Sequence, residues 1–393
     1  MSVPALRFRE FTTHWIIKKL GEISTYTKGF AFKSDDYQES GTRIVRVSDL
    51  TASAIKQDNQ MTFIDSSKSA KYAPCKINCG DIIITTVGSK PDLLESAVGR
   101  GILVTENGQG LLNQNLLKLN YSDKINNGFL FRQINSERYI AHIKNIQRGN
   151  ANQSNITLKD LFEFDVFITE TEEQTKIANF LTAVDEKITQ LTQKQDLLTK
   201  YKKGVMQQIF SQELRFKDDD GQDFPEWEEK LLGQLCSITT GKLDANAMVE
   251  DGQYRFYTCA REYYQIDKYA FDTEALLISG NGANVGYIHY YKGKFNAYQR
   301  TYVLDNFEQN IIFVKYFLDE FLHVRIFKEA KEGNTPYIVM GTLTDMEIKI
   351  PPLPEQTKIA NFLTAVDEKI TATQNQLQAV KQYKQGLLQQ MFV

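Results

Sequence analysis

The strongest constraint on this chain is a segment that occurs twice. Residues 173–189 read EQTKIANFLTAVDEKIT, and residues 355–371 repeat the same seventeen letters at an offset of 182. An identity of this length does not arise by chance, and two copies of one segment favour the same local structure. The sequence therefore predicts a tandem duplication in which each half ends in the same element.

The two halves also begin alike. Leu-Arg-Phe at 6–8 precedes Trp15, and Leu-Arg-Phe at 214–216 precedes Trp227. The stretch from the tryptophan to the repeated segment is longer in the first half than in the second. We therefore expect two variable globules, residues 1–172 and 230–354, separated by a polar linker at 211–229.

Each repeated segment opens a run in which apolar residues alternate at spacings of four and three. This spacing continues over about five heptads and is typical of a coiled-coil seam. It predicts long helices at 173–210 and 355–393, which bury each other's seams or pair with other subunits. The predicted seam residues are Ile177, Leu181, Val184, Ile188 and Leu191 in the first helix, and Ile359, Leu363, Val366, Ile370 and Leu377 in the second.

The globules show a different pattern, with short apolar or alternating runs between turns rich in Gly and Asn. Such runs indicate β-strands, and longer periodic stretches near 127–146 and 310–331 indicate helices. The predicted fold class is therefore α+β. It comprises two mixed α/β globules joined by two long helices, with a pseudo-twofold internal repeat.

Composition excludes several classes of protein. The net charge of −3, from 46 basic and 49 acidic residues, gives no bulk attraction to nucleic acid. No apolar run approaches the length of a membrane span and no secretory signal is seen, so we expect a cytoplasmic protein with no membrane contact. Cys75 and Cys79 lack a second pair, and the four histidines are scattered, so no metal site is predicted.

Three fragments resemble parts of enzymatic motifs. The glycine-rich segment 280–286 precedes a strand-like run instead of a helix, so it indicates a hairpin and not a dinucleotide loop. Asn334–Tyr337 differs from the methyltransferase Asn-Pro-Pro-Tyr loop, and Asp345–Lys349 lacks the partner aspartate of a nuclease site. No catalytic residue is predicted, and a diverged methyltransferase is disfavoured.

Two dissimilar globules on matching helices suit the recognition of a split, asymmetric DNA sequence. The alternative is a two-headed coiled-coil adaptor whose globules bind proteins and not DNA. Polar loops with Asn, Gln and Arg at equivalent places in both halves favour DNA over proteins. Three further features are the entry Leu-Arg-Phe…Trp…Leu-Gly in each half, the Pro-Leu-Pro-Glu-Gln-Thr-Lys-Ile-Ala segment at 352–360 and the repeated helix. In these features the whole chain resembles the specificity subunit of a Type I restriction-modification enzyme.

This resemblance implies that each globule is a target recognition domain that reads one half of a bipartite site on double-stranded DNA. The helices would form an antiparallel coiled coil that sets the spacer and docks two methyltransferase (modification) subunits. S-adenosylmethionine would belong to those subunits, and ATP and Mg to restriction/translocase subunits. The chain in hand would be non-catalytic. One departure is that Ile-Thr-Glu-Thr-Glu enters the first helix where Pro-Pro-Leu-Pro enters the second.

Candidate base contacts follow from the chemistry of the base edges, because Arg and Lys suit guanine and Asn and Gln suit adenine. The polar loops 148–155 and 331–337 occupy corresponding places in the two halves and are the leading candidates. The predicted DNA contacts are Arg43, Arg46, Lys90, Arg100, Asn113, Gln114, Arg148, Asn150, Asn152 and Gln153 in the first globule, and Arg261, Asn281, Asn284, Gln299, Arg300, Lys331, Asn334 and Tyr337 in the second.

The net charge is a sum over unlike parts, because acidic residues outnumber basic ones in the linker 211–229. DNA binding by this chain therefore cannot depend on bulk charge. We expect weak affinity for DNA on its own, with the partner subunits completing a positive clamp.

Overall fold

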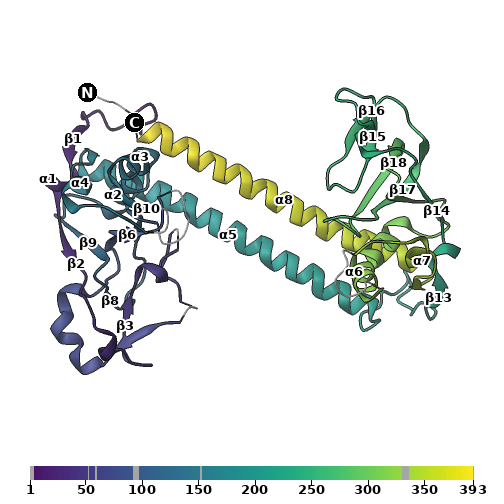
Figure 1. Cartoon of the computed structure of the whole chain (residues 1–393), viewed down its shortest axis with the longest axis horizontal. Coiled ribbons are helices and arrows are strands. Elements are labelled where there is room, and N and C mark those ends of the chain that lie inside the picture. The colour runs from purple at the N-terminus through teal and green to yellow at the C-terminus, as the bar shows by residue number, and fades with distance from the viewer. Residues whose placement is uncertain are drawn as a thin grey trace. The chain divides into compact units, whose positions relative to one another are not determined.

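A computed structural model of the chain describes residues 4–51, 53–57, 60–91, 97–150, 153–329 and 336–392. The chain divides into two compact units (Figure 1). The first unit comprises Met1–Leu191 with Gln376–Val393, and the second comprises Thr192–Asn375. Each unit therefore contains one globule and a portion of both long helices.

The first unit is a mixed α/β globule followed by the start of a long helix. Its regular elements are β1 (Ile16–Lys19), α1 (Leu20–Ile23), β2 (Ser24–Lys28), β3 (Thr42–Val45), β4 (Thr62–Ile64), β5 (Ile82–Thr85), β6 (Val87–Gly88), β7 (Gly101–Leu103), β8 (Leu111–Leu112), β9 (Leu116–Tyr121), α2 (Asn127–Ile134), α3 (Glu137–Ile146), β10 (Arg148–Asn150), β11 (Gln153–Asn155), α4 (Leu158–Phe162), β12 (Asp165–Ile168) and the start of α5 (Thr171–Phe210). The predicted helical stretch 127–146 is thus two helices, α2 and α3.

A four-stranded sheet in the order β2-β9-β5-β7 forms the centre of the first unit, and smaller sheets β4-β3-β8 and β10-β11-β6 flank it. Successive side chains of a strand point to opposite faces, so the apolar run of β5 serves two cores. Ile82 and Ile84 pack with α2, α3 and α4 on one face, and Ile83 packs with Val45 on the other. This is why the strand is apolar throughout, without alternation.

The second unit repeats much of this arrangement. Its regular elements are β13 (Glu228–Leu231), β14 (Ser237–Thr240), β15 (Tyr254–Tyr257), β16 (Tyr264–Ile266), β17 (Phe271–Ser279), β18 (Ile288–Ala297), β19 (Thr301–Asp305), α6 (Ile311–Glu329), α7 (Met340–Thr344), β20 (Glu347–Ile350) and the start of α8 (Leu353–Met391). Its strands β17 and β18 are longer than their counterparts β5 and β7. The segment 280–287 connects β17 to β18 as an antiparallel hairpin, as its sequence predicts.

The second unit has one six-stranded sheet in the order β14-β19-β17-β18-β15-β16. Its first four strands match β2-β9-β5-β7, so the two globules share a sheet frame. In both units a separate antiparallel pair, β1-β12 or β13-β20, joins the beginning of the globule to the strand that leads into the long helix. Short 3-10 segments at Ser34–Asp36, Val47–Asp49, Ser66–Cys75, Leu232–Gln234 and Ala245–Ala247 complete the described structure.

The predicted seam residues lie on the buried side of α5 and α8. In the first unit Ile177, Leu181 and Val184 share one core with Leu387 and Met391, so the beginning of α5 packs on the end of α8. In the second unit Val205 and Ile209 share a core with Ile359 and Leu363, so the end of α5 meets the beginning of α8. The helices are therefore antiparallel within each unit (Figure 1).

The remaining predicted seam positions follow the same pattern. Leu191, Val366 and Leu377 are buried, and Ile188 and Ile370 are half-buried. Helix α5 begins two residues before the predicted boundary, and α8 also begins two residues before it. Within the part of the chain that the structure describes, none of the helices combines the length and the apolar content that a membrane span requires.

Candidate nucleic-acid interface

A buried glutamate near the start of each long helix fixes the helix to its globule. Glu173 is fully buried and accepts hydrogen bonds from Arg7 Nε at 2.6 Å and Trp15 Nε1 at 3.0 Å. The Leu-Arg-Phe…Trp entry of the first half thus closes on the first turn of α5. We call this arrangement the helix latch.

The second unit has the same latch. Glu355 is fully buried and accepts from Arg215 Nε at 2.9 Å and from Trp227 Nε1 at 3.2 Å. The predicted linker 211–229 is therefore not a free tether, because its Arg215 is fixed to α8. Both latches raise the pKa of their arginine through the hydrogen bond to the glutamate.

Four chain segments of the second unit meet at one end of its sheet. We call residues 258–262, 280–287, 298–300 and 336–338 the second loop cluster. The backbone N–H of Gly280 donates to Arg300 O at 2.8 Å, that of Gly286 donates to Ser279 O at 2.8 Å, and that of Ile338 donates to Gly280 O at 2.8 Å. These bonds hold the loops against one another.

The first unit has an equivalent arrangement, the first loop cluster, made of residues 86–91, 97–100, 113–115, 148–150 and 153–156. The N–H of Thr86 donates to Asn115 O at 2.9 Å, that of Gly99 donates to Thr85 O at 2.9 Å, and that of Ile156 donates to Thr86 O at 3.1 Å. The three bonds match those of the second unit one for one. The loops predicted at 148–155 and 331–337 therefore lead into equivalent positions, Ile156 and Ile338.

The second loop cluster brings most of the predicted second-globule residues together. Arg261 Nε donates to Asn284 Oδ1 at 3.4 Å, and Asn284 Nδ2 donates to Cys259 O at 3.0 Å. Arg300 and Tyr337 are exposed in the same cluster, and Asn281 is half-exposed. Gln299 is also exposed and donates through Nε2 to Asp244 Oδ1 at 2.9 Å. Lys331 and Asn334 lie outside the described residues.

The first loop cluster also contains most of the residues predicted for its globule. Lys90, Gln114 and Gln153 are exposed in it. Arg148 is exposed and donates to Asp160 Oδ2 at 3.0 Å. Arg100 is half-buried, and burial lowers the pKa of its guanidinium. Asn150 belongs to β10, but its side chain, like the whole of Asn152, lies outside the described residues.

The sequence of the chain matches one protein family twice. The family described as "Type I restriction modification DNA specificity domain" matches residues 13–200 and 225–382. The chain belongs to this family. Each matched region covers most of one globule with its long helix, so the duplication in this specificity-domain protein is a duplication of the whole family domain.

Individual relatives carry the same description. Over 168 residues the chain is 40% identical to the EcoDI specificity subunit of Escherichia coli, and the match spans 42% of this chain and 37% of that protein. It is 24% identical to the MjaX specificity subunit of Methanocaldococcus jannaschii over 96% of this chain and 93% of that one. The crystal structure of the S subunit from M. genitalium superposes with a TM-score of 0.69 at 17% identity, covering 100% of this chain and 99% of that one, which shows a shared fold.

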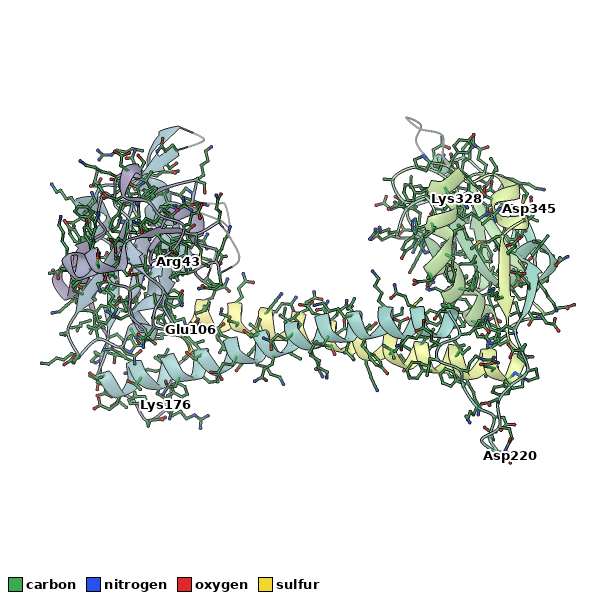
Figure 2. All side chains as sticks on the ribbon, turned by 90° about the horizontal axis from the view of Figure 1, so that it is seen from below. Arg43, Glu106, Lys176, Asp220, Lys328 and Asp345 are labelled. Carbon is green, nitrogen blue, oxygen red and sulfur yellow. The ribbon has the colours of Figure 1, made fainter. Side chains whose placement is uncertain are left out.

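Two of the residues predicted as DNA contacts in this specificity-domain protein are buried in the structure. Arg43 lies inside the first globule with 7% of its surface exposed (Figure 2). Its Nη2 donates to Lys56 O at 2.6 Å and its Nη1 to Gln57 Oε1 at 3.1 Å, because β3 is buried along most of its length. Asn113 is also buried, and its backbone forms an isolated β-bridge with Phe30, just after the end of β2. Both residues therefore have little surface to offer a ligand.

Arg46 is a weaker candidate than the sequence suggests. Its guanidinium is paired with the buried Asp49 and also donates to Gln60 O at 3.0 Å, so it holds the loop after β3. One aromatic side chain of the second loop cluster was not among the predicted contacts. Tyr287 lies under the Arg261 guanidinium, with 5.7 Å between Cζ and the ring centroid. The high tyrosine content between β15 and β18 was the available signal.

Proposed function

We propose that this chain is the DNA sequence-recognition subunit of a Type I restriction-modification complex, in which each unit reads one half of a bipartite, asymmetric site. The observation that carries the proposal is the pair of loop clusters. They have one backbone hydrogen-bond frame but different side chains upon it. A constant frame with variable side chains suits two readers of the same kind with different targets.

The difference in side chains is clearest where the loops align. Gln114 and Asn115 of the first cluster correspond to Gln299 and Arg300 of the second, because the N–H groups of Thr86 and Gly280 bond to Asn115 and Arg300 in the same way. An amide side chain suits adenine and a guanidinium suits guanine in the major groove. The two half-sites would therefore differ in base composition.

The long helices would set the separation of the two half-sites. A helix rises about 1.5 Å per residue, and the 40 residues of α5 and 39 of α8 are nearly equal in number. Because the helices have a fixed length and pack antiparallel within each unit, the length of the DNA spacer would depend on the number of residues in the helices. It would not depend on the globules.

The repeated segment also supports two equivalent docking sites for methyltransferase subunits. Packing of the seam requires only the buried residues to be the same in both copies. Exposed residues are nevertheless identical as well: Asn179, Glu186 and Lys187 in α5 recur as Asn361, Glu368 and Lys369 in α8. Constant exposed residues suit two copies of one partner. Restriction/translocase subunits would join through those partners, and catalysis with S-adenosylmethionine, ATP and Mg would belong to the partners. Such a complex would act on DNA in the cytoplasm.

The decisive experiment is to express the chain with its methyltransferase subunits and to sequence the methylated adenines of the host genome. The expected result is one motif with two unlike halves around a fixed gap. The control is the same strain without this chain, which should lack the motif. A contiguous motif, or a motif that persists without the chain, would overturn the proposal.

The protein-binding adaptor is tested in parallel. The assembled complex is passed over immobilised random duplexes at increasing salt concentration. Sequence-selective, salt-dependent retention supports DNA recognition, because release of counterions makes phosphate contacts sensitive to salt. Absence of any selective retention would favour the adaptor.

A further inference from the structure

Arg255 of β15 is held by tyrosine side chains in the second unit. Its Cζ lies 4.2 Å from the ring centroid of Tyr263 and 4.4 Å from that of Tyr291. Its Nη1 donates to the hydroxyl of Tyr257 at 3.3 Å. Contact with aromatic rings fixes the plane of a guanidinium and leaves N–H groups at its edge free to donate.

The charge of Arg255 is not neutralised by a neighbour. Among the residues that the structure describes, no aspartate or glutamate forms an ion pair with it, whereas Arg215 and Arg325 pair with glutamates. Its side chain is half-exposed. A fixed, accessible cation without an acidic partner is suited to an external anion.

The position of Arg255 is continuous with the second loop cluster. The ring of Tyr257 lies 5.0 Å from that of His289, which lies 4.8 Å from that of Tyr287 under Arg261. His289 Nε2 donates to Ala260 O at 3.0 Å and ties this aromatic row to the loop. Two residues, Phe256 and Tyr257, separate Arg255 from the start of the cluster at Thr258, a distance of about 10 Å along the strand.

We propose that Arg255 binds a DNA phosphate beside the half-site that the second loop cluster reads. This inference rests on the proposed function. The side chain belongs to a strand of the sheet and not to the loop cluster, so we assign it to the sugar-phosphate backbone and not to a base edge. Phosphate contacts of this kind fix register and orientation without carrying sequence information.

The test uses the full complex with methyltransferase subunits and a duplex that contains its methylated motif. Arg255→Gln should weaken binding about 3- to 10-fold and lower the slope of log K against log salt by about one, because one phosphate contact is lost. The methylated motif should not change. Lys328→Gln, which removes an exposed charge on α6 (Figure 2), is the matched control and should leave the slope unchanged.

Arg255→Lys keeps the charge but lacks the planar fork and its stacking on the rings. It should retain the salt slope and bind more weakly than the wild type, so it tests the proposal even if Arg255→Gln does not fold. An unchanged affinity and slope in both variants would overturn the proposal. Loss of one base preference from the motif would also overturn it, in favour of a base contact. A wild-type complex without selective binding would instead count against the proposed function.

Discussion

Lys202 Nζ lies 2.6 Å from Asp367 Oδ1 in the second unit, and Lys384 Nζ lies 2.6 Å from Asp185 Oδ1 in the first. The two ion pairs are related by the sequence offset of the repeat. Each aspartate also binds its globule, because Tyr316 Oη donates to Asp367 and Arg132 pairs with Asp185. Both helices and the globule are therefore joined at one carboxylate in each unit.

Replacement of this carboxylate should destabilise the unit that contains it. Asp367→Asn removes the ion pair with Lys202 but keeps an acceptor for Tyr316, and the pair is partly exposed, so we expect a loss of about 1 kcal/mol in the free energy of unfolding. Urea unfolding followed by circular dichroism measures it. Asp196→Asn, at an exposed position of α5, is the control. Lys202→Gln in the Asp367→Asn background should cost little further stability, because the pair is already broken, and an additional loss of about 1 kcal/mol there would contradict the role of the pair.

The helix latch gives a larger effect. Glu355→Gln leaves Arg215 and the Trp227 N–H without their buried carboxylate, at a cost of about 2–3 kcal/mol. The chain has two tryptophans, one in each unit. With 5-fluorotryptophan, fluorine NMR during urea unfolding should show a lower midpoint for Trp227 and an unchanged one for Trp15. Glu226→Gln is the control, because Glu226 is exposed and its Oε2 lies 3.9 Å from Nη1 of the same residue, Arg215. Equal shifts at both tryptophans would show that the latch is not local.

Exchange of the second globule should change one half of the recognised site. When residues 230–354 are replaced by the corresponding globule of another specificity subunit, the frame and the first loop cluster remain. Sequencing of methylated sites should then show one new half-site and one old half-site around the same gap. If both halves change, the globules do not read DNA independently.

Lengthening of both helices by one heptad should lengthen the gap. Seven residues inserted after Gln193 of α5 and after Asn375 of α8 preserve the seam and add about 10 Å, which is on the order of three base pairs. Methylation sequencing should give the same half-sites with a longer spacer. Insertion into α5 alone places the seams out of register and should lower stability. An unchanged spacer in the double insertion would contradict the role of the helices as a ruler.

The stability of the second unit should fall as the pH decreases through the titration of His289. Burial lowers the pKa of this imidazole below its usual value, so the unfolded chain binds the proton first. Stability is therefore fully present above about pH 6.5 and is lost as the pH falls towards the folded-state pKa. His289→Gln should be less stable than the wild type at pH 8, and the difference should shrink at pH 5.5. His14→Gln, at an exposed position, is the control. A difference between wild type and His289→Gln that does not depend on pH would contradict this cause.

Sequence alone was sufficient for features that depend on local pattern. The seam from Ile177 to Leu191 was predictable because its spacing is a property of one helix. Strands such as β5 and β17 were predictable because burial on both faces requires a continuous apolar run. The polar segments 148–155 and 331–337 were recognisable as candidates because each follows a predicted helix at a corresponding place in its half, and their contact with DNA stays a prediction.

Features that depend on distant segments were not predictable. The pairing of β1 with β12 joins residues about 150 positions apart, and no local signal fixes that register. Arg43 could not be distinguished from a surface arginine, because its burial depends on the loop at 56–57. Arg255 was not among the predicted contacts, because two of the tyrosines that hold it, Tyr263 and Tyr291, come from outside its own strand.

The two ion pairs have a consequence for the ancestry of the chain. Each long helix carries both an aspartate and a lysine, at 185 and 202 in α5 and at 367 and 384 in α8. A helix with both members is complementary to an identical copy of itself in the antiparallel sense. A protein with one globule and one such helix would thus have been able to form a symmetric homodimer before its gene was duplicated. After the duplication, a substitution at either aspartate must still suit both the opposite helix and the adjoining globule. The remainder of each globule is free to diverge.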